Sequence, residues 1–121
     1  MKLKGTHHIA LHTPNFAAME TFYTETLGFP VANRWDHRGI VFIDIGSTTI
    51  ELANRPQATA AGAPAGGFHH IALAVESVAD AFAEVAAKGV RIHLEPKDIG
   101  EAVIAFFYDP DGNLIELFEE K

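Results

Sequence analysis

The sequence predicts an α+β fold of two tandem βαβββ modules, whose curved mixed sheets surround a central trough. The first observation behind this prediction is an exact repeat, because His7-His8-Ile9-Ala10-Leu11 returns unchanged as His69-His70-Ile71-Ala72-Leu73. The second is a shorter repeat, because Ile50-Glu51-Leu52 returns as Ile115-Glu116-Leu117. The third is that each copy of the longer repeat is followed by the same order of helix-like and strand-like segments. Each half of the chain therefore opens with a His-bearing strand and closes with a Glu-bearing one.

Composition limits the classes of function that the chain can have. Its 121 residues suit one domain spanning 1–121, and 48% of them are hydrophobic. A net charge of −7 argues against nucleic acid and anionic membrane surfaces as partners. The absence of cysteine excludes disulfides and thiolate ligands. No apolar run approaches the roughly 18 residues of a membrane span, and we expect a cytoplasmic protein.

The first module is predicted at about residues 6–54. Its first strand is expected from Thr6 to His12, where apolar and polar residues alternate. A helix follows from about Phe16 to Leu27, with apolar residues at helical spacing, and Gly28 ends it. Three more strands are then expected, in the order Phe29 to Asp36, Ile40 to Ile45 and Thr48 to Ala53.

A linker and a second module complete the chain. The linker, residues 55–67, is rich in Ala, Gly and Pro and has no periodicity. The second module, about 68–119, repeats the order of the first. Ser77 and Asp80 resemble a capping box at the start of a helix that runs to about Lys88. The strands are expected at Phe68 to Val75, Val90 to Leu94, Ala102 to Tyr108 and Asn113 to Glu119, with a loop over Glu95 to Glu101.

Strand alternation places the second His of each repeat in the trough. His8, Ala10 and His12 share one face of the first strand, and His70 and Ala72 share the matching face of the later one. The alanines keep the trough open beside the two histidines. The preceding residues, His7 and His69, are expected to point to the opposite face and to have a structural role.

Glu51 and Glu116 lie between Ile and Leu, where a carboxylate is costly to bury unless it is paired or bound to a metal. The alternative is two solvent-facing edge strands, but that would have to arise twice, at matched positions and with matched histidines. We therefore predict one divalent transition metal per site, held by His8, Glu51, His70 and Glu116. Two imidazoles and two carboxylates favour Zn, Ni, Co, Mn or Fe(II). Such a set leaves two positions of an octahedral ion for substrate.

These features resemble the vicinal oxygen chelate superfamily, also called the glyoxalase, bleomycin-resistance and dioxygenase superfamily. The resemblance rests on the repeat, on the four ligand positions and on the turn Asp109-Pro110-Asp111-Gly112-Asn113, and it covers about Thr6 to Glu119. Glu rather than Gln at position 51 is similar to the four-ligand pattern of glyoxalase I, or lactoylglutathione lyase.

The resemblance implies a lyase and isomerase reaction on a small substrate with two adjacent oxygens, the hemithioacetal of a 2-oxoaldehyde. A proton would shift through a metal-stabilised enediolate. The resemblance also implies Glu116 as the leading catalytic base with Glu51 as its partner, although the near-symmetry of the site leaves their ranking open. It favours a homodimer, with the site formed within one chain or shared between two.

Substrate contacts and rival functions stay open from the sequence. Glyoxalase I resemblance implies an Arg four residues after the first ligand His, and position 12 is His instead. The candidate substrate-binding residues are His12, Asn54, Arg55 and Arg34. A methylmalonyl-CoA-epimerase-like enzyme, a three-ligand dioxygenase or thiol transferase, and a non-catalytic bleomycin-resistance-type binding protein are the alternatives.

Overall fold

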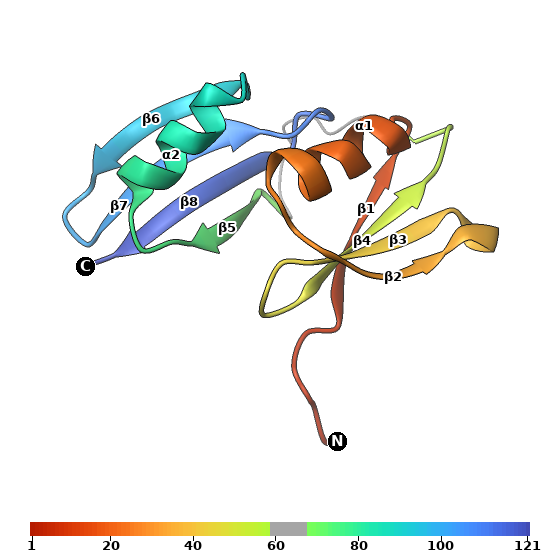
Figure 1. The fold of residues 1–121 in the computed structure, drawn as a ribbon. Helices are drawn as coiled ribbons and strands as arrows, with labels where there is room; N and C mark the ends of the chain where they lie inside the picture. Colours follow the sequence, from red (N-terminus) through yellow and green to blue (C-terminus); the bar gives the residue numbers. More distant parts are fainter. Residues whose placement is uncertain (59–67) are drawn as a thin grey trace. The chain divides into compact units, whose positions relative to one another are not determined.

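The structure, a computed structural model, describes residues 1–58 and 68–121. The chain divides into two compact units, Met1–Ala60 and Ala61–Lys121. Each unit consists of one four-stranded mixed sheet and helical segments after its first strand (Figure 1). This confirms the predicted α+β fold of two βαβββ modules. Most of the predicted linker, 55–67, lies outside the described residues.

The first unit forms a sheet in the order β1-β4-β3-β2. β1 pairs with β4 in parallel, and the other two pairings are antiparallel. Parallel neighbours need a long connection, and here the connection between β1 and β4 contains the helix and the β2–β3 hairpin. The elements are β1 (His8–Thr13), α1 (Phe16–Thr21), the π-helical turn η1 (Phe22–Thr26), β2 (Val31–Trp35), the 3₁₀ turn η2 (Asp36–Arg38), β3 (Ile40–Asp44) and β4 (Thr49–Asn54).

The second unit repeats this topology with the sheet order β5-β8-β7-β6. β5 and β8 are parallel, and β8–β7 and β7–β6 are antiparallel. The elements are β5 (His70–Ala74), α2 (Val78–Ala87), β6 (Ile92–Asp98), β7 (Ala102–Tyr108) and β8 (Leu114–Glu120). Each unit thus places its His-bearing first strand directly beside its Glu-bearing last strand.

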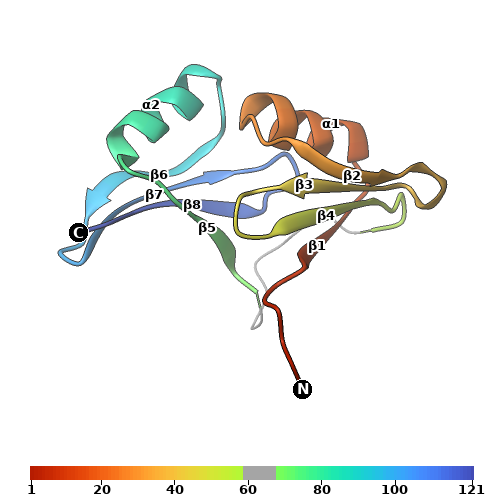
Figure 2. The ribbon, with the colours of Figure 1, turned by 60° about the horizontal axis from the view of Figure 1, so that its bottom comes forward.

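One face of each sheet packs against the helix of its own unit, as Figure 2 shows for α1 and α2. We call the opposite face the helix-free face. On the helix side, the two central strands and the helix bury large side chains almost completely, each contributing about 1.5–3 kcal/mol. In the first unit these are Met19, Tyr23, Val41, Ile43, Ile50 and Leu52, and in the second Val78, Val85, Phe107, Ile115 and Leu117.

Two predicted elements differ from the structure. The helix after Phe16 changes to a π-helical turn, in which the Leu27 N–H donates to the Phe22 carbonyl at 2.9 Å, before Gly28 ends it at φ 81°. The predicted loop over Glu95 to Glu101 was wrong in its first half, because β6 continues to Asp98. Pro96 has no backbone N–H to donate, but β6 is an edge strand, and its register with β7 shifts between Leu94 and Lys97.

The start of α2 confirms Ser77 as the N-cap of the predicted capping box. The Ser77 hydroxyl accepts from the Asp80 N–H at 3.1 Å. The Glu119 carboxylate on β8 accepts from the Val78 N–H at 2.8 Å. Two of the backbone donors at the helix start are therefore satisfied by side chains, and one of them ties the helix to the sheet.

Ser77→Ala is expected to lower the free energy of unfolding by about 1 kcal/mol, because an N–H group of the first turn loses its acceptor. Urea denaturation followed by circular dichroism measures this change. Ser47→Ala, in an exposed turn, is the matched control and should shift the midpoint little. Equal effects of the two substitutions would contradict the capping role.

Candidate functional site

The two units carry matching groups of side chains on their helix-free faces. Strand register explains the match, because Ala10 is paired with Glu51 and Ala72 with Glu116. In each case the His lies two residues before the alanine and therefore on the same face as the Glu. We call His8 with Glu51 the first half-site and His70 with Glu116 the second half-site.

The His and Glu of each half-site meet through the same atoms. The distance between His8 Nε2 and Glu51 Oε2 is 2.6 Å, and that between His70 Nε2 and Glu116 Oε2 is 2.9 Å. Both histidine side chains are about one-third exposed, whereas the carboxylates are 16% and 9% exposed. A carboxylate this well buried needs a charged or hydrogen-bonding partner, and the imidazole supplies it.

An aromatic ring supports each half-site, and the sequence analysis did not identify it. Phe42 is paired with Glu51 across β3 and β4, and Phe106 with Glu116 across β7 and β8. Their rings contact the histidines edge to face, with centroids 5.7 Å apart for His8 and 5.2 Å for His70. The sequence did offer one sign of their role, because each Phe lies in the third strand of its module.

His7 and His69 do not point away from the half-sites, and the prediction that they do was wrong. His7 Nδ1 lies 2.8 Å from His8 Nδ1, and His69 Nδ1 lies 2.9 Å from His70 Nδ1. Strand alternation does not apply to them because β1 begins at His8 and β5 at His70. Each repeat therefore places two imidazoles side by side.

The donor atoms of the half-sites suit a transition metal. Adjacent ligands of an octahedral ion with bonds of about 2.1 Å are about 3 Å apart, close to the observed Nε2 to Oε2 separations of 2.6 and 2.9 Å. Each half-site supplies one imidazole and one carboxylate. Within residues 1–58 and 68–121, no group of three or more His, Asp or Glu side chains is arranged so that it could hold a metal ion. The four-ligand set His8, Glu51, His70 and Glu116 stays a prediction.

Three predicted substrate-binding residues lie at the end of β1 and of β4. His12 is exposed and paired with Ala53, on the same face as His8 and Glu51. The Asn54 N–H donates to the Gly39 carbonyl at 2.7 Å, and alternation puts its side chain on the opposite face from Glu51. Arg55 donates to the carbonyls of Arg38 and Asn54 at 3.2 and 2.8 Å. Of the three, His12 is the one that shares the face of the half-site.

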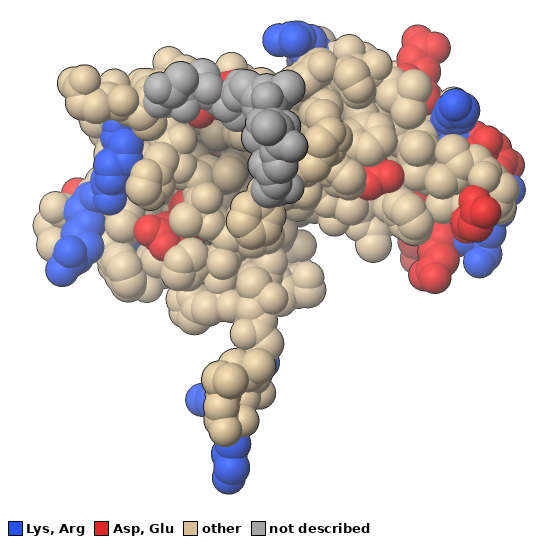
Figure 3. Space-filling view, turned by 180° about the vertical axis from the view of Figure 1, so that it is seen from behind, with Lys and Arg blue, Asp and Glu red and all other residues tan. Residues whose placement is uncertain are grey.

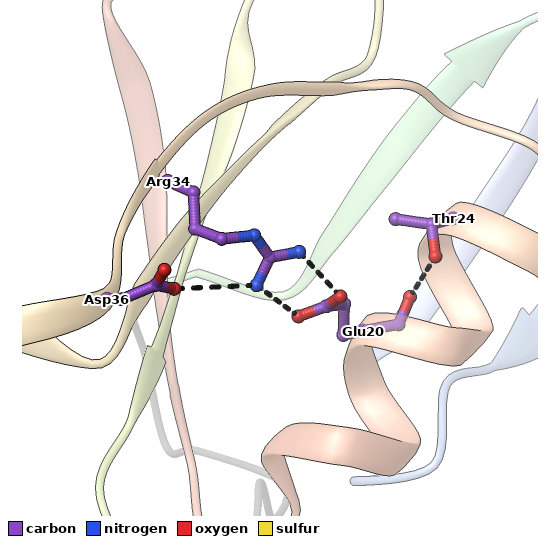
Figure 4. A network of polar contacts seen from close by, with 4 residues as sticks. All are labelled: Glu20, Thr24, Arg34 and Asp36. Carbon is purple, nitrogen blue, oxygen red and sulfur yellow. Dashed lines mark hydrogen bonds and ion pairs between the residues drawn. The ribbon is translucent and has the colours of Figure 1, made fainter.

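Arg34 has a partner on α1. Its guanidinium forms a two-pronged hydrogen bond to the Glu20 carboxylate at 3.0 and 2.7 Å, with Asp36 at 4.0 Å (Figure 4). The Glu20 carbonyl accepts from the Thr24 hydroxyl in the same network. The bond to Glu20 raises the pKa of Arg34 above its ordinary value. Arg34 ties β2 to the helix, and its predicted contact with substrate stays untested.

The surroundings of the two half-sites differ. In the first unit, Trp35 is 41% exposed and packs edge to face on Phe42, with ring centroids 4.8 Å apart. In the second, the Tyr108 hydroxyl lies 2.6 Å from His93 Nδ1, and the Arg91 guanidinium lies 4.1 Å from the Tyr108 ring centroid. His93 also contacts Phe106, with ring centroids 6.2 Å apart. The sequence did not point to His93, Tyr108 or Arg91 as residues near the site.

Charge is distributed in small groups over the face drawn in Figure 3, where uncharged residues cover most of the surface. Lys and Arg number 9 in the whole chain, against 16 Asp and Glu. Among the helices of residues 1–58 and 68–121, none is long and apolar enough to span a membrane.

Comparison with known proteins identifies relatives over the whole chain. The model of the Glyoxalase/Bleomycin resistance protein/Dioxygenase superfamily matches residues 5–117. The uncharacterized protein YwkD of Bacillus subtilis (strain 168) is 31% identical over 128 residues, covering 99% of this chain and 100% of the relative. The lactoylglutathione lyase of Escherichia coli O157:H7 is 45% identical over 56 residues, 45% of this chain and 42% of that enzyme. The structure of the trypanothione-dependent glyoxalase I of Leishmania major is 30% identical, with a TM-score of 0.74, and the match covers 93% of this chain and 84% of that one.

Arg34→Ala and Glu20→Ala are each expected to lower the free energy of unfolding by less than about 1 kcal/mol, because both side chains are partly exposed. The double variant should cost less than the sum of the two, since the second substitution removes no further contact. A double-mutant cycle from urea denaturation measures this coupling. Strict additivity would contradict the pairing.

Proposed function

Because the chain belongs to the glyoxalase/bleomycin resistance protein/dioxygenase superfamily, we propose that it is a metal-dependent, glyoxalase I-like lyase and isomerase. The observation that carries the proposal is the duplicated half-site, in which His8 meets Glu51 and His70 meets Glu116 through the same atoms. A structural role would not require the same costly carboxylate twice, at matched positions and beside matched imidazoles.

The four half-site residues would together hold one divalent transition metal. His8 and Glu51 supply one imidazole and one carboxylate, and His70 and Glu116 supply the same pair again. The two half-sites would come from one chain or from two chains of a homodimer. When bound, the ion would polarise two adjacent oxygens of the substrate and make the neighbouring C–H more acidic.

The chain's own carboxylates would move the proton. We assign Glu116 as the base that removes the proton from one carbon and returns it to the next, and Glu51 as its partner. Glu116 is the more buried of the two, and burial shields a carboxylate from competing water. Before an ion binds, His8 and His70 orient the carboxylates through their Nε2 contacts.

The substrate would be a small compound with two adjacent oxygens, such as the hemithioacetal of a 2-oxoaldehyde and a thiol. Partial similarity to lactoylglutathione lyase supports this class. His12 shares the face of the first half-site and would contact the end of the substrate that is remote from the reacting carbons. Because position 12 is not Arg, the thiol need not be glutathione.

The geometry of Glu51 weighs against a three-ligand dioxygenase or thiol transferase. Such a site would use the positions of His8, His70 and Glu116 and leave Glu51 off the metal. Glu51 instead meets His8 at 2.6 Å, as closely as Glu116 meets His70. The two carboxylates are therefore assigned equivalent positions toward the ion.

Elemental analysis of the purified protein, followed by hemithioacetal isomerisation after reloading with Ni, Co and Zn, tests the proposal. We expect about one ion for each set of four ligands, as the paired donors of one half-site alone are too few for tight binding. Turnover should appear on reloading and disappear with a chelator. A protein that binds none of these ions after reloading would contradict the proposal, and bound metal without turnover would move the substrate search to acyl-CoA epimers.

Glu116→Gln is expected to reduce kcat by roughly 10²- to 10⁴-fold, because the amide cannot accept the proton. Glu51→Gln should reduce kcat less if Glu116 is the base. Steady-state kinetics with metal content measured on the same samples separates lost chemistry from lost metal. Glu84→Gln, exposed on α2, is the matched control. A larger kcat loss for Glu51→Gln at equal metal content would reverse the two assignments.

A further inference from the structure

We infer that His7 and His69 are positioning residues, which orient the imidazoles of His8 and His70 toward their carboxylates and toward the proposed ion. This inference rests on the proposed function and adds to it the reason that each repeat carries two adjacent histidines. The proposed ligand set uses the second His of each pair and leaves the first without a role.

The contact is the same in both units. The two Nδ1 atoms are 2.8 Å apart in His7–His8 and 2.9 Å apart in His69–His70. The rings cross nearly at right angles, at 83° and 86°, with centroids 5.1 and 5.2 Å apart. These distances are hydrogen-bond distances, and the two units arrive at them independently.

His7 is held in place for this contact. The Thr49 hydroxyl on β4 donates to the His7 carbonyl at 2.9 Å, two residues before Glu51 on the same strand. The His7 ring also packs edge to face on Phe42, with centroids 6.2 Å apart. His7, His8 and Glu51 are therefore arranged around the same pair of strands.

The chemistry of imidazole explains why a second histidine suits this position. A neutral imidazole has one N–H and one lone pair, so one Nδ1 of each pair must donate and the other accept. While His8 Nε2 donates to Glu51, His8 Nδ1 accepts from His7. With an ion on Nε2, the Nε2 proton of His8 would pass to solvent and the shared Nδ1 proton would move from His7 to His8. His7 would take a proton from solvent on its own Nε2, and His8 Nδ1 would then donate to His7.

A histidine partner can therefore serve both states, whereas a carbonyl or carboxylate can only accept. His7 and His69 would hold the ligand imidazoles at one orientation before and after the ion binds. The orientation of a metal-binding imidazole by the partner of its second nitrogen affects affinity by roughly 10- to 100-fold.

His7→Ala and His69→Ala test the inference through affinity for Zn²⁺, measured by competition with a chromophoric chelator. Each is expected to raise Kd by roughly 10-fold or more. His7→Asn should restore much of the affinity, because the δ atoms of Asn are bonded to Cγ as Nδ1 is and can both donate and accept. His37→Ala, in the exposed turn η2, is the control and should leave Kd unchanged.

A second readout needs no metal. The ¹⁵N shifts of the His8 ring report its tautomer, and His7→Ala in the metal-free protein should mix the two tautomers where the unchanged protein has one. Unchanged Kd and unchanged His8 shifts in His7→Ala would overturn the inference. If the unchanged protein binds no Zn²⁺, the proposed function fails on that result, and the metal-free shifts alone decide whether His7 orients His8.

Discussion

The parallel pairing of the first and last strands within each unit is the constraint on which both half-sites depend. It places His8 and Glu51, 43 residues apart in the chain, on adjacent strands and on one face. A slip of one residue in this pairing would move the Glu to the helix side and separate it from the His. The same argument holds for β5 and β8 in the second unit.

The hydrophobic core maintains this register. Ile50 and Leu52 flank Glu51, and each is at most 1% exposed on the helix side of the sheet. Returning two such side chains to water would cost about 3–6 kcal/mol, a large part of the stability of a small domain. The burial of Ile and Leu against α1 thus fixes Glu51 on the helix-free face. In this way the apolar neighbours of the Glu51 carboxylate determine where it points.

The sequence predicted the fold because the module occurs twice, and the same duplication predicted a His-bearing first strand and a Glu-bearing last strand in each module. The repeat identified the modules, and alternation along β1 and β4 identified the face. The prediction of side-chain direction failed for His7, where strand alternation does not apply. His7 lies before the first residue of β1, so the strand rule does not set its direction. Phe42 and Arg34 required pairing information, because the partner of each lies on another element: Glu51 for the first and Glu20 for the second.

The two units are alike at the half-sites and different around them, and this difference bears on the proposed reaction. In the proposed site, matched half-sites would treat the two oxygens of a substrate alike, and a hemithioacetal is not symmetric. The direction in which such a substrate binds must then come from residues that differ between the units. Trp35 beside Phe42 offers an apolar surface in one unit, whereas His93 and Tyr108 beside Phe106 offer polar groups in the other. Duplication would account for the proposed metal ligands, and divergence of the flanking residues would account for the orientation of the proposed substrate.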